Sequence, residues 1–382
     1  MKILSYLNIS NINDIECDSG YIFNYTLYNS FVKDKIDFKI ILPEELKEQK
    51  IRFLNKDVFF TNMGKTKYKT RYFFPWDEMY RIILDFAPDV IFINQCELTS
   101  SIKALLIENN LSKIKLVTYC HYPALHINEV GNSVIDYTLN DSNIGQSIVY
   151  NILSAINIAD VFVIQSSFAK TMLLNFANFH NFILSKDIFV FPPPYDANII
   201  KNDIEPVKTD KILYNHRLYE SYGASKFVDF VQANPDLNFI VTDPMWHRDD
   251  LRKKFNSSPE KNREILNKQN NVKLCNGNIR SQYIKLIDKS RLAIAPFRTA
   301  CVWSMSIIDC YCRGIPVIGP NIAAFPELIP SFLLYSSPLE ERALIERLLY
   351  DDNFWIESVY ECRKILKKIE PNNIVNKILA SL

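Results

Sequence analysis

The stretch PFRTACVWSMSIIDCYCRGIPVI, residues 296–318, contains one complete unit of an α/β fold. An apolar run ends just before Pro296, a polar loop follows, and a helical pattern covers Met305–Arg313. Ser304 stands directly before that pattern, and serine is among the residues preferred at a helix N-cap. A second apolar run follows at Pro316–Ile318. Two short strands joined through a helix are typical of a parallel sheet, so this stretch predicts one.

The same alternation of short apolar runs and longer helical patterns continues in both directions along the chain. The segments expected as strands are Ile3–Leu7, Phe38–Leu42, Val90–Ile93, Lys115–Tyr119, Val161–Ile164, Ile188–Phe191, Ile212–Tyr214, Asn238–Thr242, Val272–Leu274, Leu292–Ile294 and Pro316–Ile318. The segments expected as helices are Trp76–Phe86, Ser101–Glu108, Gln146–Ile158, Phe168–Phe176, Ala224–Gln232, Gln282–Ile287, Met305–Arg313, Glu340–Leu349, Phe354–Lys368 and Asn372–Ala380. This order predicts an α/β protein with doubly wound, Rossmann-like parallel sheets.

The length of the chain and one proline-rich segment predict two domains. A chain of 382 residues is too long for one ordinary core. The segment Phe191–Asp196 holds three consecutive prolines, which remove backbone donors and end regular structure. We therefore expect domains over residues 1–193 and 194–365, with residues 366–382 helical and packed back on the first. Ligands of such folds bind where strands end, so a cleft between the two domains is expected.

Composition excludes several other classes of protein. The net charge of +1 gives no overall attraction to nucleic acid or to anionic lipid. The eight cysteines form no Cys-x-x-Cys pair and no cluster with histidine, which fits a reducing compartment and disfavours zinc. We find neither a signal peptide nor an apolar run of about 18 residues, the minimum for a membrane-spanning helix. These features predict a cytoplasmic protein.

The decisive stretch also carries a motif, because Asp309 stands five positions before Gly314 of a Gly-x-Pro-Val sequence. It resembles the nucleotide-sugar signature of retaining glycosyltransferases of the GT-B architecture. The resemblance implies that Ser304, Met305 and Ser306 hold the donor phosphates through the helix N-terminus, and that Asp309 contacts the ribose. Free N–H groups and the dipole of a helix N-terminus suit a diphosphate. The family's first acidic residue is replaced by Cys301.

Further matches to this family follow in the same order along the chain. Asn215–Leu218, followed by Tyr222 and Gly223, is similar to the Gly-Arg-Leu…Lys-Gly element, so Arg217 is expected to neutralise the donor diphosphate. Tyr222 replaces the family's lysine, and Lys226 is the expected substitute. The donor-side residues of the loop that resembles the family's nucleobase loop are Gly277, Asn278 and Ile279.

The first domain has two similar features. His121 follows the run Lys115–Tyr119, and a strand-end histidine at this place resembles the family residue that contacts the donor sugar. The sequence Asp18–Tyr21 resembles the family's small-residue loop, which implies donor contact by Gly20 and acceptor contact by Ser19.

The resemblance implies a retaining transfer from a UDP-sugar such as UDP-glucose, with no cofactor. We expect Arg217, His121 and Lys226 to act in catalysis, mainly by stabilising the leaving diphosphate. No Asp-x-Asp-like sequence follows a strand, so metal-independent transfer is expected.

The acceptor is expected on the first domain, where Lys65–Trp76 interleaves cations with aromatic residues. In an extended segment, alternating cations share one face, which could follow a phosphate backbone. The acceptor-side residues are Lys67, Lys69, Arg71 and, after a strand, Glu97. Similarities to phage DNA-base α-glucosyltransferases and to the queuosine-tRNA mannosyltransferase favour a hydroxymethylated pyrimidine in phage DNA. If a phage encodes the protein, the expected location is the host cytoplasm.

Three alternatives stay open for the chain and for this segment. The enzyme could build a surface polysaccharide or glycolipid, since the basic segment could also meet anionic headgroups. The chain could bind sugar nucleotides without catalysis, because Cys301 and Tyr222 replace polar groups of the family. The basic segment could also be the solvated face of an edge hairpin.

Overall fold

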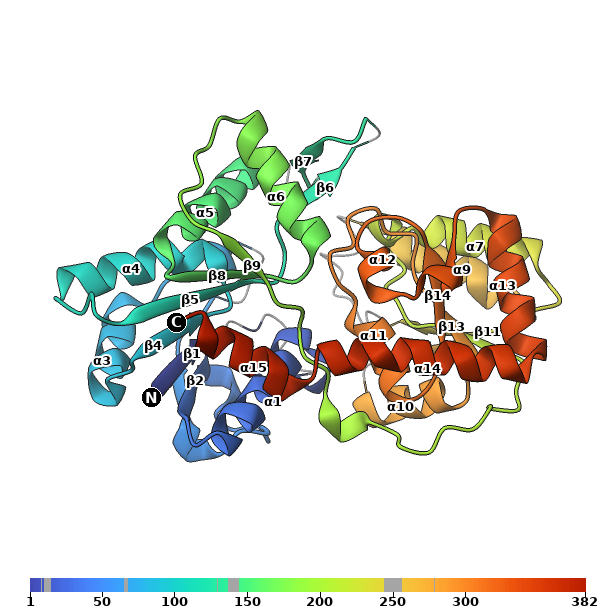
Figure 1. Ribbon diagram of the computed structural model, residues 1–382, viewed down its shortest axis with the longest axis horizontal. Coiled ribbons are helices and arrows are strands. Elements are labelled where there is room, and N and C mark those ends of the chain that lie inside the picture. Colours follow the sequence, from blue (N-terminus) through green and yellow to red (C-terminus); the bar gives the residue numbers. More distant parts are fainter. Residues whose placement is uncertain are drawn as a thin grey trace. The chain divides into compact units, whose positions relative to one another are not determined.

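The computed structural model describes residues 1–7, 9, 15–64, 68–128, 130–136, 144–243, 256–277 and 279–382. It divides the chain into two compact units (Figure 1). Unit 1 comprises Met1–Pro194 together with Pro371–Leu382, and unit 2 comprises Tyr195–Glu370.

Unit 1 is built on a seven-stranded parallel sheet in the order β3-β2-β1-β4-β5-β8-β9. Its strands are β1 (Lys2–Tyr6), β2 (Asp37–Pro43), β3 (Val58–Thr61), β4 (Val90–Ile93), β5 (Lys115–Cys120), β8 (Val161–Ile164) and β9 (Ile188–Val190). In the centre, Ile3 pairs with Phe38 on one side and Val90 on the other. Every residue of β4 and β8 is buried, as expected for strands covered on both faces.

Helices cover both faces of this sheet. They are α1 (Ser19–Lys33), α2 (Lys69–Tyr72), α3 (Trp76–Phe86), α4 (Thr99–Glu108), α5 (Ile144–Ile158), α6 (Ser167–Phe179) and α15 (Pro371–Ala380), with a small hairpin of β6 (Leu125–Ile127) and β7 (Ser133–Ile135). One core cluster joins the sheet to α1 and to Ile374, Val375 and Ile378 of α15. A second joins its other face to α3 and α4. The C-terminal helix therefore belongs to unit 1.

Unit 2 repeats this design around a six-stranded parallel sheet in the order β12-β11-β10-β13-β14-β15. Its strands are β10 (Lys211–Tyr214), β11 (Asn238–Asp243), β12 (Val272–Asn276), β13 (Leu292–Ile294), β14 (Val317–Pro320) and β15 (Leu334–Tyr335). Its helices are α7 (Ala224–Ala233), α9 (Ser258–Asn267), α10 (Arg280–Asp288), α11 (Met305–Cys312), α12 (Phe325–Leu328), α13 (Pro338–Tyr350) and α14 (Asp352–Lys368). The expected α/β class with two doubly wound parallel sheets is confirmed.

Two expectations about local structure are wrong. Asp18–Tyr21 is no loop, because the Asp18 carboxylate accepts a hydrogen bond of 2.9 Å from the N–H of Tyr21 and caps α1. The segment Lys65–Trp76 is not one extended strand either. Lys69–Tyr72 forms a helical turn, so Lys69 and Arg71 do not alternate along a strand.

No helix in the described part of the chain is long and apolar enough to cross a lipid bilayer.

Candidate functional site

In unit 2 the end of β10 is joined directly to the first turn of α11. The buried side chain of Asn215 donates hydrogen bonds to the carbonyl of Ser306, at 3.2 Å, and to the Tyr283 hydroxyl, at 2.8 Å. Asn215 directly follows β10, and Arg217 lies two residues further on with its side chain exposed. Two segments that the sequence analysis linked only by resemblance are therefore neighbours in space.

The N-terminus of α11 is open. Ser304 occupies the N-cap position, as expected, with extended backbone angles of φ −142° and ψ 106°. Its side chain makes no capping hydrogen bond to the helix. The first N–H groups of a helix have no partner within the helix, and the positive end of the dipole lies there. Met305 and Ser306 belong to this first turn and are partly exposed, so the turn can accept an anion.

Two guanidinium groups lie beside one aromatic ring near this turn. The Cζ of Arg217 is 5.9 Å and the Cζ of Arg298 is 4.2 Å from the ring centroid of Tyr222. Arg298 belongs to the loop between β13 and α11. Such stacking against an aromatic ring holds a cation in place. Arg298 could not be predicted from the sequence, because only the fold brings it next to Tyr222, which replaces the family's lysine.

Gly223 makes this arrangement possible. Its φ of 66° is left-handed, and a Cβ atom there would lie 2.3 Å from the carbonyl oxygen of Phe297. Only glycine combines this φ with such close approach of two backbones. The Tyr222 loop and the Arg298 loop are thereby held together.

Lys226, the expected substitute for the missing lysine, has a different neighbour. Its Nζ lies 3.4 Å from the ring centroid of Phe297, in the loop that also carries Arg298. Its role in catalysis stays a prediction.

His216 directly precedes Arg217 in the chain and is close enough to Arg298 for that charge to affect its pKa. It is buried, and burial together with the nearby charge of Arg298 lowers its pKa to about 3. Both causes disfavour a positive charge, so His216 is neutral. The positive groups at this end of unit 2 are the arginines and the lysine rather than the histidine.

Asp309 is already engaged by a side chain of unit 2. Both of its carboxylate oxygens accept hydrogen bonds from Arg280, at 2.7 and 2.9 Å, and Asp309 is only 5% exposed. A bidentate pair of this kind fixes a carboxylate firmly. Arg280 directly follows the loop that was expected to border the nucleobase, and its pairing with Asp309 was not predicted from the sequence. The expected contact of Asp309 with ribose stays a prediction and would have to share the carboxylate with Arg280.

The structure describes only part of the loop that is expected to border the nucleobase. Gly277 directly follows β12, and Ile279 occupies the N-cap position of α10 with 52% of its surface exposed. Asn278 lies outside the described residues.

In unit 1, His121 directly follows β5 and is held by a polar network. Its Nε2 is 3.0 Å from Oδ1 of Asn94, which follows the neighbouring strand β4. The rings of Phe23 and Tyr119 pack against the imidazole, with centroids 4.8 and 4.7 Å away. Burial lowers the His121 pKa to about 4, so the ring is neutral near pH 7.

Ser19 and Gly20, expected in a loop, form the first turn of α1 instead. The Gly20 carbonyl accepts a hydrogen bond of 2.9 Å from Asn24, one turn further along. Contacts of Ser19 and Gly20 with substrates stay predictions. Such contacts would be made by the N-terminus of a helix instead of by a loop.

Of the other expected acceptor-binding residues, the structure describes Lys69, Arg71 and Glu97, and Arg71 does not join the basic face that the sequence predicted. Arg71 turns toward the protein and pairs at 2.9 Å with Glu97, whose side chain is 4% exposed. Lys69 is exposed on the same helical turn, and Lys65 and Lys67 lie outside the described residues. Arg71 therefore does not contribute to the expected basic face. It pairs with the buried carboxylate of Glu97, which needs a cation as its partner.

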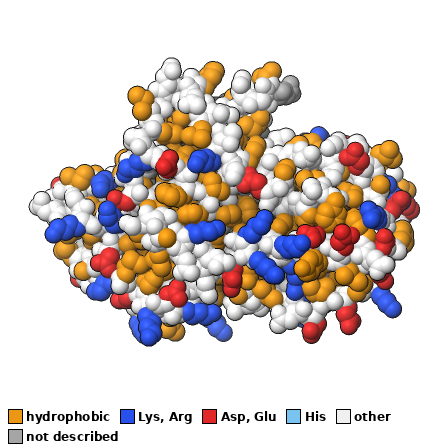
Figure 2. All heavy atoms as spheres, in the orientation of Figure 1, with side chains coloured by type: hydrophobic (Ala, Val, Ile, Leu, Met, Phe, Trp, Pro, Cys, Tyr) orange, Lys and Arg blue, Asp and Glu red, His pale blue; other side chains and the backbone are white. Residues whose placement is uncertain are grey.

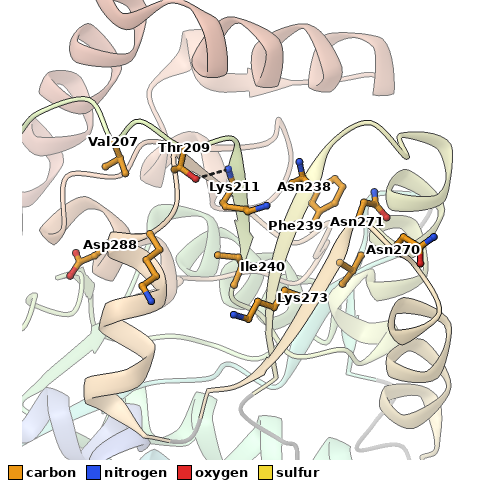
Figure 3. A pocket seen from close by; sticks show the side chains of 12 residues that line it. Val207, Thr209, Lys211, Asn238, Phe239, Ile240, Asn270, Asn271, Lys273 and Asp288 are labelled. Atoms are coloured by element: carbon orange, nitrogen blue, oxygen red, sulfur yellow. Dashed lines mark hydrogen bonds between the residues drawn. The ribbon is translucent and has the colours of Figure 1, made fainter.

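A separate pocket of about 510 Å³ lies at the amino ends of three strands of the unit 2 sheet (Figure 3). Lys211, Asn238 and Val272 line it, and they are the first residues of their three strands. Parallel sheets bind ligands at the carboxyl ends of their strands, where Arg217 and α11 lie. We therefore do not assign this pocket to the donor.

In the part of the chain that the structure describes, neither the surface charge nor the metal-binding side chains indicate a further site. On the face shown in Figure 2, Lys and Arg are interspersed with Asp and Glu. Within the described residues, no three His, Cys, Asp or Glu side chains are grouped as a metal site requires.

Comparison with solved structures finds the same architecture in several proteins. Alr3699/HepE from Anabaena, solved with UDP-glucose, matches with a TM-score of 0.67 and 14% identity over 100% of both chains. Sucrose-phosphate synthase from Thermosynechococcus elongatus matches with a TM-score of 0.74 and 10% identity, over 99% of this chain and 97% of the other. An alpha-glucosyltransferase solved with UDP-glucose and DNA containing an abasic site matches with a TM-score of 0.63 and 13% identity, over 100% and 98%.

Identities this low show a shared fold and nothing more. The chain has the GT-B fold of these proteins, as its sequence resemblance predicted. No protein-family model matches the chain, and comparison with curated protein sequences finds no match.

Proposed function

We propose that this protein is a retaining glycosyltransferase that takes its sugar from a UDP-sugar such as UDP-glucose. The observation that carries the proposal is the placement of Arg217 and Arg298 on one tyrosine ring, beside a helix N-terminus without a side-chain cap. Two proteins of the same fold, HepE and an alpha-glucosyltransferase, were solved with UDP-glucose.

The chemistry proposed for this site is stabilisation of a leaving group. The bond between the anomeric carbon and the diphosphate oxygen breaks, and its electrons stay on the diphosphate. Arg217, Arg298 and the N–H groups of the first turn of α11 neutralise the charge that develops there. The acceptor oxygen bonds to the anomeric carbon on the same face, and its proton passes to the departing diphosphate oxygen. No metal ion is required in this scheme.

For the acceptor we propose a hydroxymethylated pyrimidine in DNA. One protein of this fold was solved with a 13-mer DNA that contains a hydroxymethyluracil base. In unit 1, Tyr72, Phe73 and Trp76 are 41%, 39% and 37% exposed, next to the exposed Lys69. Exposed aromatic rings stack on unpaired bases, and a lysine can contact a phosphate. A glycan is the alternative acceptor, since TarM of this fold was solved with alpha-GlcNAc-glycerol.

One experiment tests both the donor site and the acceptor. The protein and its Arg217→Ala variant are incubated with radiolabelled UDP-glucose and with hydroxymethylated DNA or a lipid-linked glycan. We expect label in the DNA for the wild type, and a loss of at least about 100-fold for Arg217→Ala, the range seen when one charge-stabilising donor is removed. Unchanged thermal melting of the variant is the control for folding.

The outcomes separate the two parts of the proposal. Label only in the glycan would overturn the DNA acceptor and keep the transferase. Near-normal transfer by Arg217→Ala would overturn the assignment of the diphosphate site.

A further inference from the structure

A pair of buried asparagine side chains lies beside His121 in unit 1. Asn24 comes from α1 and Asn94 follows β4, and they are 0% and 7% exposed. Their amides bond to each other reciprocally, with each Nδ2 at 3.1 Å from the Oδ1 of the other. Buried amides are kept only where their hydrogen bonds are satisfied, so this pair is a fixed element of the site.

Backbone carbonyls decide which way each amide points. Nδ2 of Asn94 donates to the carbonyl of Tyr6 at 3.0 Å, and Nδ2 of Asn24 donates to the carbonyl of Gly20 at 2.9 Å. A carbonyl can only accept, so flipping either amide would set two acceptors against each other. The hydroxyl of Ser5 fits the same orientation, because it donates to Oδ1 of Asn24 at 2.8 Å.

The orientation of Asn94 in turn decides the protonation of His121. Oδ1 of Asn94 faces Nε2 of His121 at 3.0 Å and can only accept. Nε2 must therefore carry the hydrogen. In a neutral imidazole the other nitrogen is then unprotonated, so Nδ1 is an acceptor. Burial lowers the pKa of the imidazole and therefore disfavours a second proton.

We propose that Asn94 is a positioning residue that holds His121 as its Nε2–H tautomer, so that Nδ1 acts only as a hydrogen-bond acceptor toward a hydroxyl of the donor sugar. The hydroxyl part rests on the proposed function, whereas the tautomer does not. Asn24 supports this role by fixing Asn94. In the other tautomer Nδ1 would carry the hydrogen, so it would donate a hydrogen bond instead of accepting one from the sugar hydroxyl.

Nuclear magnetic resonance of the intact protein tests the tautomer directly. The five histidines are labelled with ¹⁵N, and the resonances of His121 are those that disappear in His121→Gln. Long-range ¹H–¹⁵N correlation distinguishes the protonated nitrogen from the unprotonated one. We expect a protonated Nε2 and an unprotonated Nδ1 near pH 7. A protonated Nδ1, or a mixture of tautomers, in the wild type would overturn the proposal.

Two variants test whether Asn94 is the cause. Asn94→Leu removes the acceptor for Nε2–H at similar volume, and we expect a mixture of tautomers. Ser5→Ala is the matched control, because it removes another member of the network and leaves the His121–Asn94 bond in place; its tautomer should match the wild type. A single Nε2–H tautomer in Asn94→Leu would contradict the role of Asn94. The wild-type spectrum decides the tautomer even if that variant does not fold.

Kinetics then test the link to the sugar. For Asn94→Leu we expect kcat/KM for UDP-glucose to fall about tenfold, the contribution of one neutral hydrogen bond, with UDP affinity unchanged. An unchanged kcat/KM with mixed tautomers would overturn the hydroxyl contact. Absence of transfer in the wild type would instead refute the proposed function and leave the tautomer result standing.

Discussion

Tyr222 stands where the resemblance places a lysine, and the structure brings a cation to it from a different loop. Arg298 lies closer to its ring than Arg217 does, at 4.2 against 5.9 Å. We therefore expect Arg298→Ala to lower kcat/KM by about 100-fold or more, as loss of a charge-stabilising group does. Lys226→Ala should cost no more than about tenfold, because its ammonium is set over Phe297. Steady-state transfer assays measure both.

A double variant separates charge from packing at this point. Tyr222→Lys in the Arg298→Ala background returns a cation to the position of the family's lysine and should recover part of the lost rate. Equal losses for Arg298→Ala and Lys226→Ala would contradict the assignment of the second cation to Arg298.

Contacts between residues that are distant in the sequence could not be predicted. Arg217 and Ser304 were predicted from their motif, because local spacing is preserved in the chain. The pairing of Asp309 with Arg280 joins residues on α11 and α10, and that of Arg71 with Glu97 joins α2 to the short 3₁₀ helix Cys96–Leu98. Such contacts depend on tertiary packing, which one sequence does not reveal. For the same reason the Asn24–Asn94 pair could not be predicted from the sequence.

At the scale of elements, prediction succeeded where the pattern contrasts with its surroundings. Val90–Ile93, Val161–Ile164 and Leu292–Ile294 were predicted with the bounds observed, because short apolar runs flanked by polar residues are typical of buried parallel strands. The helix α1 was missed. It buries nine of its 15 residues, among them Asn24, Thr26 and Ser30, so no polar face alternates with an apolar one.

The loop that carries Tyr222 can be tested by comparing substitutions at two glycines. One substitution would cause backbone strain alone, and the other would cause backbone strain and a steric clash. Gly223 and Gly131 both have left-handed φ, of 66° and 83°. A Cβ at Gly223 would lie 2.3 Å from the carbonyl oxygen of Phe297, whereas nothing lies within 4 Å of one at Gly131. Gly131→Ala should cost about 1 kcal/mol of unfolding free energy, from backbone strain alone.

Gly223→Ala should cost more, about 2–4 kcal/mol, and should also lower kcat/KM because the Arg298 loop must move. Denaturant unfolding and transfer assays of the two variants measure these effects. Equal stability and equal activity for both variants would contradict the close packing of the two loops.

For the whole molecule, two units of the same design carry different titratable groups. In unit 1, the half-buried His121 has a pKa lowered by desolvation to about 4, from an ordinary value of 6.5. Unit 2 buries His216, with a pKa lowered to about 3, and Glu341, with a pKa raised by burial from 4.5 to about 7. A histidine with a lowered pKa destabilises the folded state as pH falls below 6.5, because only the unfolded chain takes up the proton. A carboxyl group with a raised pKa acts in the opposite sense: its contribution is full below 4.5 and is lost as pH rises through about 7.

Between pH 7 and pH 5 these effects add differently in the two units. Each tenfold change in proton affinity is worth about 1.4 kcal/mol, so His121 should cost unit 1 about 1–2 kcal/mol over this range. In unit 2 the gain from Glu341 offsets the loss from His216. We therefore expect acidification to weaken unit 1 first. Hydrogen–deuterium exchange of peptides from each unit, measured at both pH values and corrected for the intrinsic rate, reports this order.

Two substitutions assign the effect to its groups. His121→Gln removes the proton uptake and should make exchange in unit 1 nearly independent of pH over this range. Glu341→Gln removes the compensation and should make unit 2 as sensitive to acid as unit 1, while stabilising it above pH 7, where the buried carboxylate would otherwise be charged. Earlier loss of protection in unit 2 of the wild type would show that the gain from Glu341 does not offset the loss from His216.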